Sequence, residues 1–322
     1  MSTELRPLAD LPSAHLAEAV AQATVWVLVN PVEYHGPHLS LLNDHHCSLG
    51  LARLLAQRLP GPHLMAGELG LGVEPASGPG SRHSSYGEVR STVLETCRSL
   101  VELGARRVVL MTFHGAPMHN HALHAGATWL ARQGVAAAAP FALLLDDLVE
   151  LDDEAIGPAF DTIADPADQR LAREGLALDF HAGFFETSVA LTLAPHTVDP
   201  CHREVPDCPA WPVLGWLEQL AKAVPGRLGA ELTAIARIAG WTSLRPFPGY
   251  TGCPRLASAE AGEVFVQAMV DAFAEETLRA FDTARPHRPL MSWLRWLTLG
   301  GRVEPPRVPL DAFSPGPPAS PP

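Results

Sequence analysis

The chain has 322 residues, of which 47% are hydrophobic and 18% charged, and a formal net charge of −12. This apolar content excludes an intrinsically disordered chain, and the length excludes a small scaffold held together by disulfides. The 23 basic residues include a single lysine, Lys222, and form no basic stripe along the chain. We therefore expect neither a nucleic acid nor a membrane as a partner.

The compartment is inferred from the cysteines and from the first residues. Five cysteines, with no C-x-x-C pair, favour a reducing environment. Residues 1–14 lack the apolar run of a signal peptide, and the longest apolar stretch, residues 135–145, is too short to span a bilayer. We expect a cytoplasmic protein.

Helices and strands are predicted to alternate along the first half of the chain. Residues 24–29 form a continuous run of β-branched and apolar residues, which is typical of a strand buried on both faces of a parallel sheet. Leucines recur at helical spacing over residues 44–59 and stop at a Pro-Gly pair. A helix over 89–103, a strand over 107–112 and a helix over 120–132 follow in turn. This alternation predicts a layered α/β fold.

The second half of the chain gives weaker signals. We predict a third strand in residues 135–145, a surface excursion over the acidic residues 146–168, and helices over 186–193, 213–224 and 257–281. The chain is divided into one domain over residues 1–288, an apolar C-terminal segment over 289–302, and a disordered tail over 303–322 that contains eight prolines.

Histidines and carboxylates gather where strands end or helices begin. Fifteen histidines are present, and eleven of them lie between His35 and His181. The polar residues that follow predicted strands or open predicted helices are Glu33, His35, Asp44, His114, His181 and Glu186. In open α/β sheets the loops at the carboxyl edge meet, so these side chains can converge although about 150 residues separate them.

Such a set of side chains favours metal chemistry. Carboxylates and imidazoles together suit zinc, manganese or iron(II), and three carboxylates with two imidazoles exceed what one catalytic ion usually takes from a protein. We therefore expect two divalent ions. Ions bridged by a carboxylate can lower the pKa of a shared water enough for hydrolysis near neutral pH.

Three ordered motifs resemble those of the creatininase (creatinine amidohydrolase) family. Residues 33–39, EYHGPHL, followed by Asp44, are similar to the family pattern E-x-H-G-P-H-L-P and its later aspartate. Residues 179–188, DFHAGFFETS, resemble D-x-H-A-G-x-x-E-T-S, and residues 249–263 resemble a late stretch rich in Gly, Pro, Ala and Glu. The resemblance covers residues 24–281.

This resemblance implies a three-layer α/β/α fold with a mainly parallel sheet, and hydrolysis of a C–N bond in a cyclic or linear amide. Carried over residue by residue, it makes metal ligands of Glu33, His35, Asp44, His114 and Glu186, with Asp44 bridging the two ions. His181 is the implied acid/base residue. A small-molecule amide is then the expected partner, and a homo-oligomer the expected assembly.

The departures from the family concern the wall that faces the substrate. Residues 112–117, TFHGAP, replace N-G-H-G-G-N, and Ala116 stands where creatininases proper carry a metal-binding glutamate. We therefore expect substrate contacts from Tyr86, Phe113, Ala116 and Pro117, and a substrate other than creatinine.

Two alternatives stay open. The altered wall is compatible with a family member that has lost turnover and acts as a small-molecule binding or assembly protein. A two-metal enzyme of the arginase type is a weaker rival, because Asp179 and His181 resemble its ligands while its further aspartates are missing.

Overall fold

The computed structural model describes residues 5–147, 153–211, 213, 215–304 and 307–313. Within these residues the strands form one five-stranded, wholly parallel sheet in the order β1-β3-β2-β4-β5. The strands are β1 (Leu5–Pro7), β2 (Thr24–Val29), β3 (His63–Leu69), β4 (Arg107–Met111) and β5 (Ala136–Ala138). The predicted strands over 24–29 and 107–112 are therefore confirmed.

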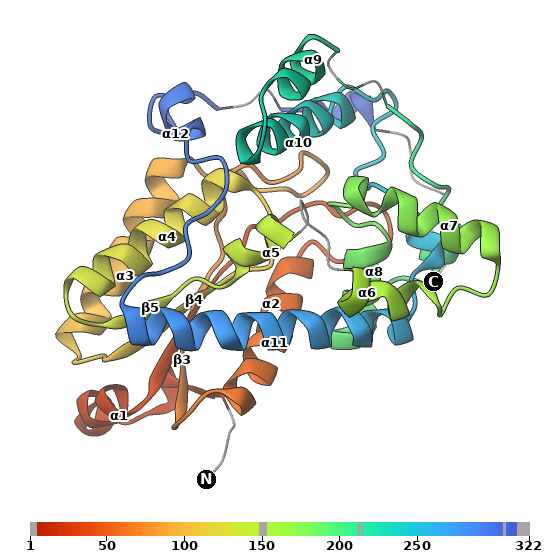
Figure 1. The fold of residues 1–322 in the computed structure, drawn as a ribbon. Helices are drawn as coiled ribbons and strands as arrows, with labels where there is room; N and C mark the ends of the chain where they lie inside the picture. The colour runs from red at the N-terminus through yellow and green to blue at the C-terminus, as the bar shows by residue number, and fades with distance from the viewer. Residues whose placement is uncertain (1–4, 148–152, 212, 214, 305–306, 314–322) are drawn as a thin grey trace.

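Helices cover both faces of this sheet and give the expected three-layer α/β/α fold (Figure 1). The helices are α1 (Leu16–Gln22), α2 (Asn43–Arg58), α3 (Tyr86–Glu102), α4 (Pro117–Arg132), α5 (Phe141–Asp147), α6 (Asp153–Phe160), α7 (Pro166–Gly175), α8 (Phe184–Leu193), α9 (Gly215–Ala223), α10 (Arg227–Trp241), α11 (Ala259–Thr283) and α12 (Leu294–Leu297). None of those in the described ranges is long and apolar enough to cross a membrane.

Alternation along β2 explains why its residues 25–29 are apolar at every position. Trp26 and Leu28 enter a core with α2, α8 and α11, whereas Val25, Val27 and Val29 enter a second core with α3 and α4. Successive side chains of a strand point to opposite faces, so a central strand covered on both sides must be apolar at every position.

The structure corrects the prediction for residues 135–145. Only Ala136–Ala138 form a strand, and α5 begins at Phe141, directly after Pro140. A short apolar run carries no periodicity that separates a buried strand from a buried helix, so the proline was the better guide.

Other elements were not predicted at all. Strands β1 and β3 were missed, as was α10. The acidic stretch 146–168, predicted as a surface excursion, contains α6 and the start of α7, and Ala159 and Phe160 of α6 are buried; its residues 148–152 lie outside the described ranges.

The C-terminal segments lie against the body of the protein. Leu290, Met291 and Leu294 are buried in the α3–α4 core, whereas Trp296 is 86% exposed. Val308 and Ala312 pack near Trp241 and Phe247, and the Phe247 amide donates to the Ala312 carbonyl. These contacts differ from the disordered tail predicted for 303–322, because its few apolar residues find a cluster to cover; residues 314–322 lie outside the described ranges.

Candidate metal centre

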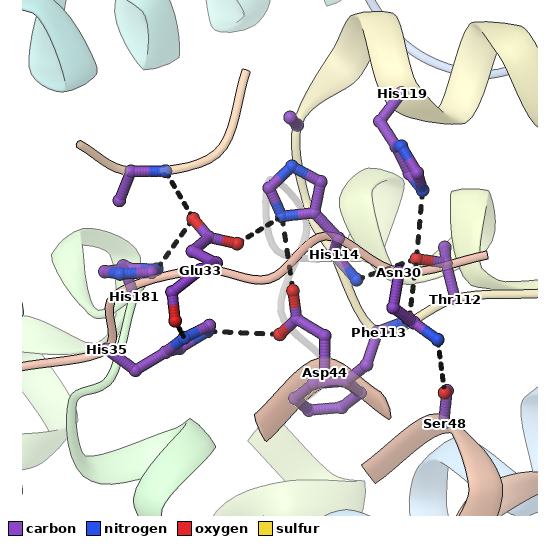
Figure 2. Close-up of polar contacts among 12 residues, drawn as sticks. Asn30, Glu33, His35, Asp44, Ser48, Thr112, Phe113, His114, His119 and His181 are labelled. Carbon is purple, nitrogen blue, oxygen red and sulfur yellow. Dashed lines mark hydrogen bonds and ion pairs between the residues drawn. The ribbon is translucent and has the colours of Figure 1, made fainter. Parts of the chain in front are cut away.

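Six buried side chains from distant parts of the chain meet at the carboxyl edge of the sheet. Figure 2 shows Glu33, His35, Asp44, His114 and His181 turned toward one another. Glu33 and His35 lie in the loop after β2, Asp44 in the first turn of α2, His114 just after β4, His181 before α8, and Glu186 in the first turn of α8. The structure thus brings together every predicted metal ligand and the predicted acid/base residue. Their burial leaves the carboxylates little access to water.

Glu33, Asp44 and His114 form one half of the cluster. The Nδ1 atom of His114 lies 2.8 Å from Oε2 of Glu33 and 3.5 Å from Oδ2 of Asp44. One potential ligand atom from each of the three residues lies within 4.8 Å of the others. This half offers two carboxylates and one imidazole.

His35, His181 and Glu186 form the other half, and Asp44 joins it to the first. The Nε2 atom of His35 lies 3.1 Å from Oδ1 of Asp44 and 3.8 Å from Oε2 of Glu186. The imidazole rings of His35 and His181 are 4.4 Å apart between centroids. Asp44 therefore turns one carboxylate oxygen toward each half, which is the disposition that a bridging ligand requires.

Main-chain carbonyls fix the orientation of all three histidines. His35 donates from Nδ1 to the Glu33 carbonyl at 3.1 Å, and His114 donates from Nε2 to the Val73 carbonyl at 2.9 Å. His181 donates from Nε2 to the Tyr34 carbonyl at 2.9 Å. In each ring the other nitrogen then faces the carboxylates with its lone pair, as in histidines that bind metals.

Several carboxylate oxygens of the cluster are buried hydrogen-bond acceptors that have no donor among the described residues. Oε2 of Glu33 and both carboxylate oxygens of Asp44 are buried and accept no hydrogen bond from any described residue. In the neutral form of His35 and His114, which is the form that binds a metal, the lone pairs of their free nitrogens point at the same oxygens. Buried acceptors without donors cost free energy unless a cation lies among them, so this donor set fits a divalent metal ion in each half.

The pKa values express the same negative field. Burial opposes the charged form of His35, but its carboxylate neighbours, Asp44 first, raise its pKa to about 10. Burial raises the pKa of Glu186 to about 8, helped by Asp44 and Glu33 and opposed by His35. His181 differs, because burial and the nearby His35 lower its pKa to about 4 and leave it neutral at neutral pH.

Asp179 and Thr251 hold the loop that carries His181. The Asp179 carboxylate accepts hydrogen bonds from the amides of Phe184, at 2.7 Å, and Phe185, and so caps α8. The Thr251 hydroxyl accepts from the His181 amide at 3.0 Å. Thr251 was given no role from the sequence, and Asp179 entered only as a ligand in the arginase-type alternative, although both lie in motifs that resemble the family.

A glycine from the third motif makes this support possible. Gly252 has a φ of +60°, and a Cβ there would lie 2.1 Å from Oδ2 of Asp179. Only glycine combines this left-handed backbone with so close an approach. The third motif therefore supports the second, which explains why the two motifs occur together.

Two other histidines of the sequence pattern have structural contacts. His38 lies close to the Thr187 hydroxyl of α8, with Nε2 at 2.9 Å. His119 accepts from the Val73 amide at Nδ1 and donates from Nε2 to the Val29 carbonyl. His119 thus ties the end of β2 to the loop that orients His114.

A cavity of about 1080 Å³ opens onto the cluster. Of the residues predicted to contact substrate, Tyr86, Ala116 and Pro117 line it. Phe113 is not among the lining residues, because its ring is buried between Phe141 and Phe185, with centroids 5.6 and 6.2 Å away. Phe113 follows a buried strand and its ring turns into the core, so the prediction that Phe113 contacts substrate is not supported.

One whole side of the cavity was not predicted from the sequence. It is lined by α10 and by residues between 290 and 308. The ring of Trp241 lies 5.5 Å from that of His181, measured between centroids. An amphipathic pattern over Leu228, Ile235 and Ile238 was the available signal for this helix.

The fold and site define a class of α/β/α proteins with a buried carboxylate–histidine cluster that suits two metals. Residues 9–277 match the family model described as creatininase, creatinine amidohydrolase, and the chain belongs to this family. Membership supports a metal-dependent hydrolase of non-peptide C–N bonds. A search of curated proteins found no match.

Solved creatininases share the fold. A structure entitled "Creatininase Mn" is 23% identical, with a TM-score of 0.55 over 86% of this chain and 99% of that one. A mutant creatininase of Zn-Zn type is 22% identical, with a TM-score of 0.55 over 86% of this chain and 99% of that one. A mutant creatininase complexed with creatine is also 22% identical, with a TM-score of 0.54 over 86% of this chain and 99% of that one. At these identities the likeness concerns the architecture.

Proposed function

We propose that the chain is a two-metal amidohydrolase that cleaves a C–N bond in a cyclic or linear amide. Glu33, Asp44 and His114 would hold one divalent ion, and His35, Asp44 and Glu186 the other. Zinc, manganese and iron all suit this mixed oxygen and nitrogen donor set. The observation that carries the proposal is the set of buried carboxylate oxygens that face histidine lone pairs and accept no hydrogen bond from the described residues.

When bound, the ions would lower the pKa of a coordinated water and polarise the amide carbonyl. His181 supplies the proton transfer. As a neutral imidazole with Nε2–H held by the Tyr34 carbonyl, it can accept a proton only at Nδ1, which lies 3.8 Å from Oε1 of Glu33. The same nitrogen then gives the proton to the departing amine, which leaves poorly as an anion.

Creatinine is not the proposed substrate. Pro117 replaces an asparagine of the family pattern, Ala116 stands where creatininases proper carry a glutamate, and both line the cavity with Tyr86. Each buried polar group of creatinine left without a partner would cost about 1–3 kcal/mol. This wall therefore favours a less polar or bulkier amide.

Elemental analysis tests the metal centre. We expect up to two equivalents of zinc, manganese or iron per chain in purified protein, and less in Glu33→Ala. Asp161→Ala, which alters an exposed carboxylate outside the cluster, is the matched control and retains the metal. The proposal would be overturned if the purified protein contained no metal and Glu33→Ala left the metal content unchanged.

Turnover distinguishes the enzyme from a binding protein. Metal-loaded protein is assayed on creatinine, lactams, formamides and short peptides. Hydrolysis of an uncharged amide in preference to creatinine is expected. If no compound is hydrolysed with any of the three metals while one of them still raises the melting temperature, the chain is a binding or assembly protein instead.

His181 is tested by separating metal content from rate. With His181 as acid/base, His181→Ala retains both metals and lowers kcat by about 10²- to 10⁴-fold. Loss of one metal equivalent in this variant would instead make His181 a ligand of the ion near His35 and Glu186.

We also propose a homo-oligomer in the cytoplasm. Trp296, Leu297 and Leu299 are 86%, 68% and 66% exposed, and such apolar area is usually covered by another surface. The five cysteines are free, as expected in a reducing compartment. Light scattering at micromolar concentration should give a multiple of the chain mass, and a monomer would refute the assembly.

A further inference from the structure

The cavity extends well beyond the carboxylate–histidine cluster. Its volume of about 1080 Å³ lies at the upper end of the range for sites that enclose drug-sized ligands. A small polar ring next to the metals would leave most of it unfilled. The remaining wall therefore bears on what else the substrate carries.

One face of α10 forms part of this wall. Ala230, Ala234, Ile238 and Trp241 line the cavity at the spacing of successive turns, which places them on the same side of the helix, and the polar Thr233 and Arg237 of α10 also line it. From Ala230 to Trp241 the helix rises about 16 Å at 1.5 Å per residue. Since Trp241 lies beside His181, this face leads away from the cluster along the cavity.

The C-terminal segment completes the wall. Leu290, Leu294 and Leu297 line the same cavity, and Ala234 packs against the core cluster that contains Leu290 and Leu294. Figure 1 shows α10 and α12 together above the carboxyl ends of the strands. We name the region lined by Ala230, Ala234, Ile238, Leu290, Leu294 and Leu297 the apolar chamber.

A buried carboxylate holds the two parts of the chamber together. Glu231 of α10 accepts from the Met291 amide at 2.9 Å and from the Trp293 indole at 2.7 Å. Its side chain is 8% exposed, so these hydrogen bonds are largely shielded from water. The chamber is thus a defined wall of the cavity.

We propose that the apolar chamber receives an alkyl or aryl group attached to the scissile amide. The proposal rests on the proposed function, because it places the reacting bond at the cluster and the apolar group along α10. An apolar group leaving water gains about 0.8 kcal/mol per methylene, which is about fourfold in kcat/KM. The substrate class is therefore amides that carry an extended apolar substituent.

N-alkylformamides from methyl to octyl test this inference. Water adds across one C–N bond in every member of the series, giving formate and the alkylamine, so only the alkyl length varies. With metal-loaded protein we expect kcat/KM to rise about fourfold per methylene until the chamber is filled. A series that is flat or falls with length would overturn the inference.

Variants on α10 locate the effect. Ala234→Trp fills the chamber and should lower the ratio of kcat/KM for the octyl compound to kcat/KM for the methyl compound by about 60-fold, the equivalent of three methylenes. Leu228→Trp, on an exposed part of the same helix that does not line the cavity, is the control. If Ala234→Trp fails to fold, Ile238→Ser should weaken the octyl preference in the same direction.

Calorimetry on the purified protein separates the two proposals. Tighter binding of the octyl compound, lost in Ala234→Trp, without any hydrolysis would overturn the proposed function and support the chamber. Hydrolysis without dependence on length would support the function and overturn the chamber. Absence of both binding and hydrolysis would overturn both.

Discussion

The metal centre and the apolar chamber face the same cavity but are built differently. The cluster residues lie between 33 and 186, at strand ends and first helical turns, where the sheet fixes their positions. The chamber is built from α10 and residues after 289, and Glu231 joins its parts. Reactive geometry is thus tied to the sheet, while the shape of the site depends on elements that can change without displacing a ligand.

The largest effect is expected at the residue shared by both halves of the cluster. Asp44→Asn removes the negative charge between His35 and His114 and should lower the metal content of both positions. Loss of a residue that only hydrogen-bonds to a metal ligand lowers activity by roughly 10- to 100-fold, and Asp44→Asn should lower turnover by more than this. Elemental analysis and kcat measure this, with the exposed Asp10→Asn as control. Retention of two metals would show that Asp44 does not bridge.

Gly252 tests whether the third motif supports the second. Gly252→Ala should cost about 1–2 kcal/mol for the left-handed backbone and more for the contact with Asp179, and it should lower activity by moving His181. Gly104→Ala is the matched control, since Gly104 also has a positive φ but a Cβ there meets nothing within 4 Å. Equal losses in urea unfolding would mean that the contact with Asp179 is irrelevant.

Glu231 tests whether the chamber can be loosened without disturbing the cluster. Glu231→Ala removes the acceptor of three hydrogen bonds, from Met291, Trp293 and Arg227, and should lower the free energy of unfolding by about 2–4 kcal/mol. Turnover of methylformamide should persist while the octyl preference declines. Glu218→Ala, in an exposed pair with Lys222, should cost less than about 1 kcal/mol. Loss of both activities would mean that the two regions are not independent.

The smallest effect concerns pH. Burial, with His114 nearby, lowers the pKa of His119 to about 3, so between pH 3 and 6.5 the unfolded chain binds more protons than the folded one. The contribution of His119 to the free energy of unfolding is therefore fully present above pH 6.5 and is lost as the pH falls from 6.5 toward 3. From pH 7 to 5.5 it should account for about 1.3 kcal/mol. His119→Gln should be less sensitive to acid by this amount in urea unfolding, and an unchanged sensitivity would refute the assignment.

The central strands and the candidate ligands could be predicted because local sequence determines them. Residues 25–29 of β2 are apolar at every position since both faces of the strand are covered, and Asp44 opens a helix with a clear leucine pattern. The candidate ligands could be predicted because they lie where such strands end or such helices begin. A loop residue next to a predicted strand end is placed by the strand itself.

The missed elements depend on partners distant in sequence. Strand β3, His63–Leu69, contains a glycine and no β-branched residue, and pairing with β1 and β2 stabilises it. Phe113 follows a strand as His114 does, but its side chain turns into the core. Local pattern does not distinguish these two directions when a strand ends in a loop.

The carbonyls that orient the three histidines belong to the main chain at Glu33, Tyr34 and Val73. Every amino acid carries such a carbonyl. Tyr34 and Val73 can therefore be exchanged during evolution without loss of these hydrogen bonds, provided that the backbone path is kept. Natural relatives should vary at residues 34 and 73 while the three histidines keep the same tautomers, which sequence comparison and nitrogen-15 NMR of the imidazoles can check.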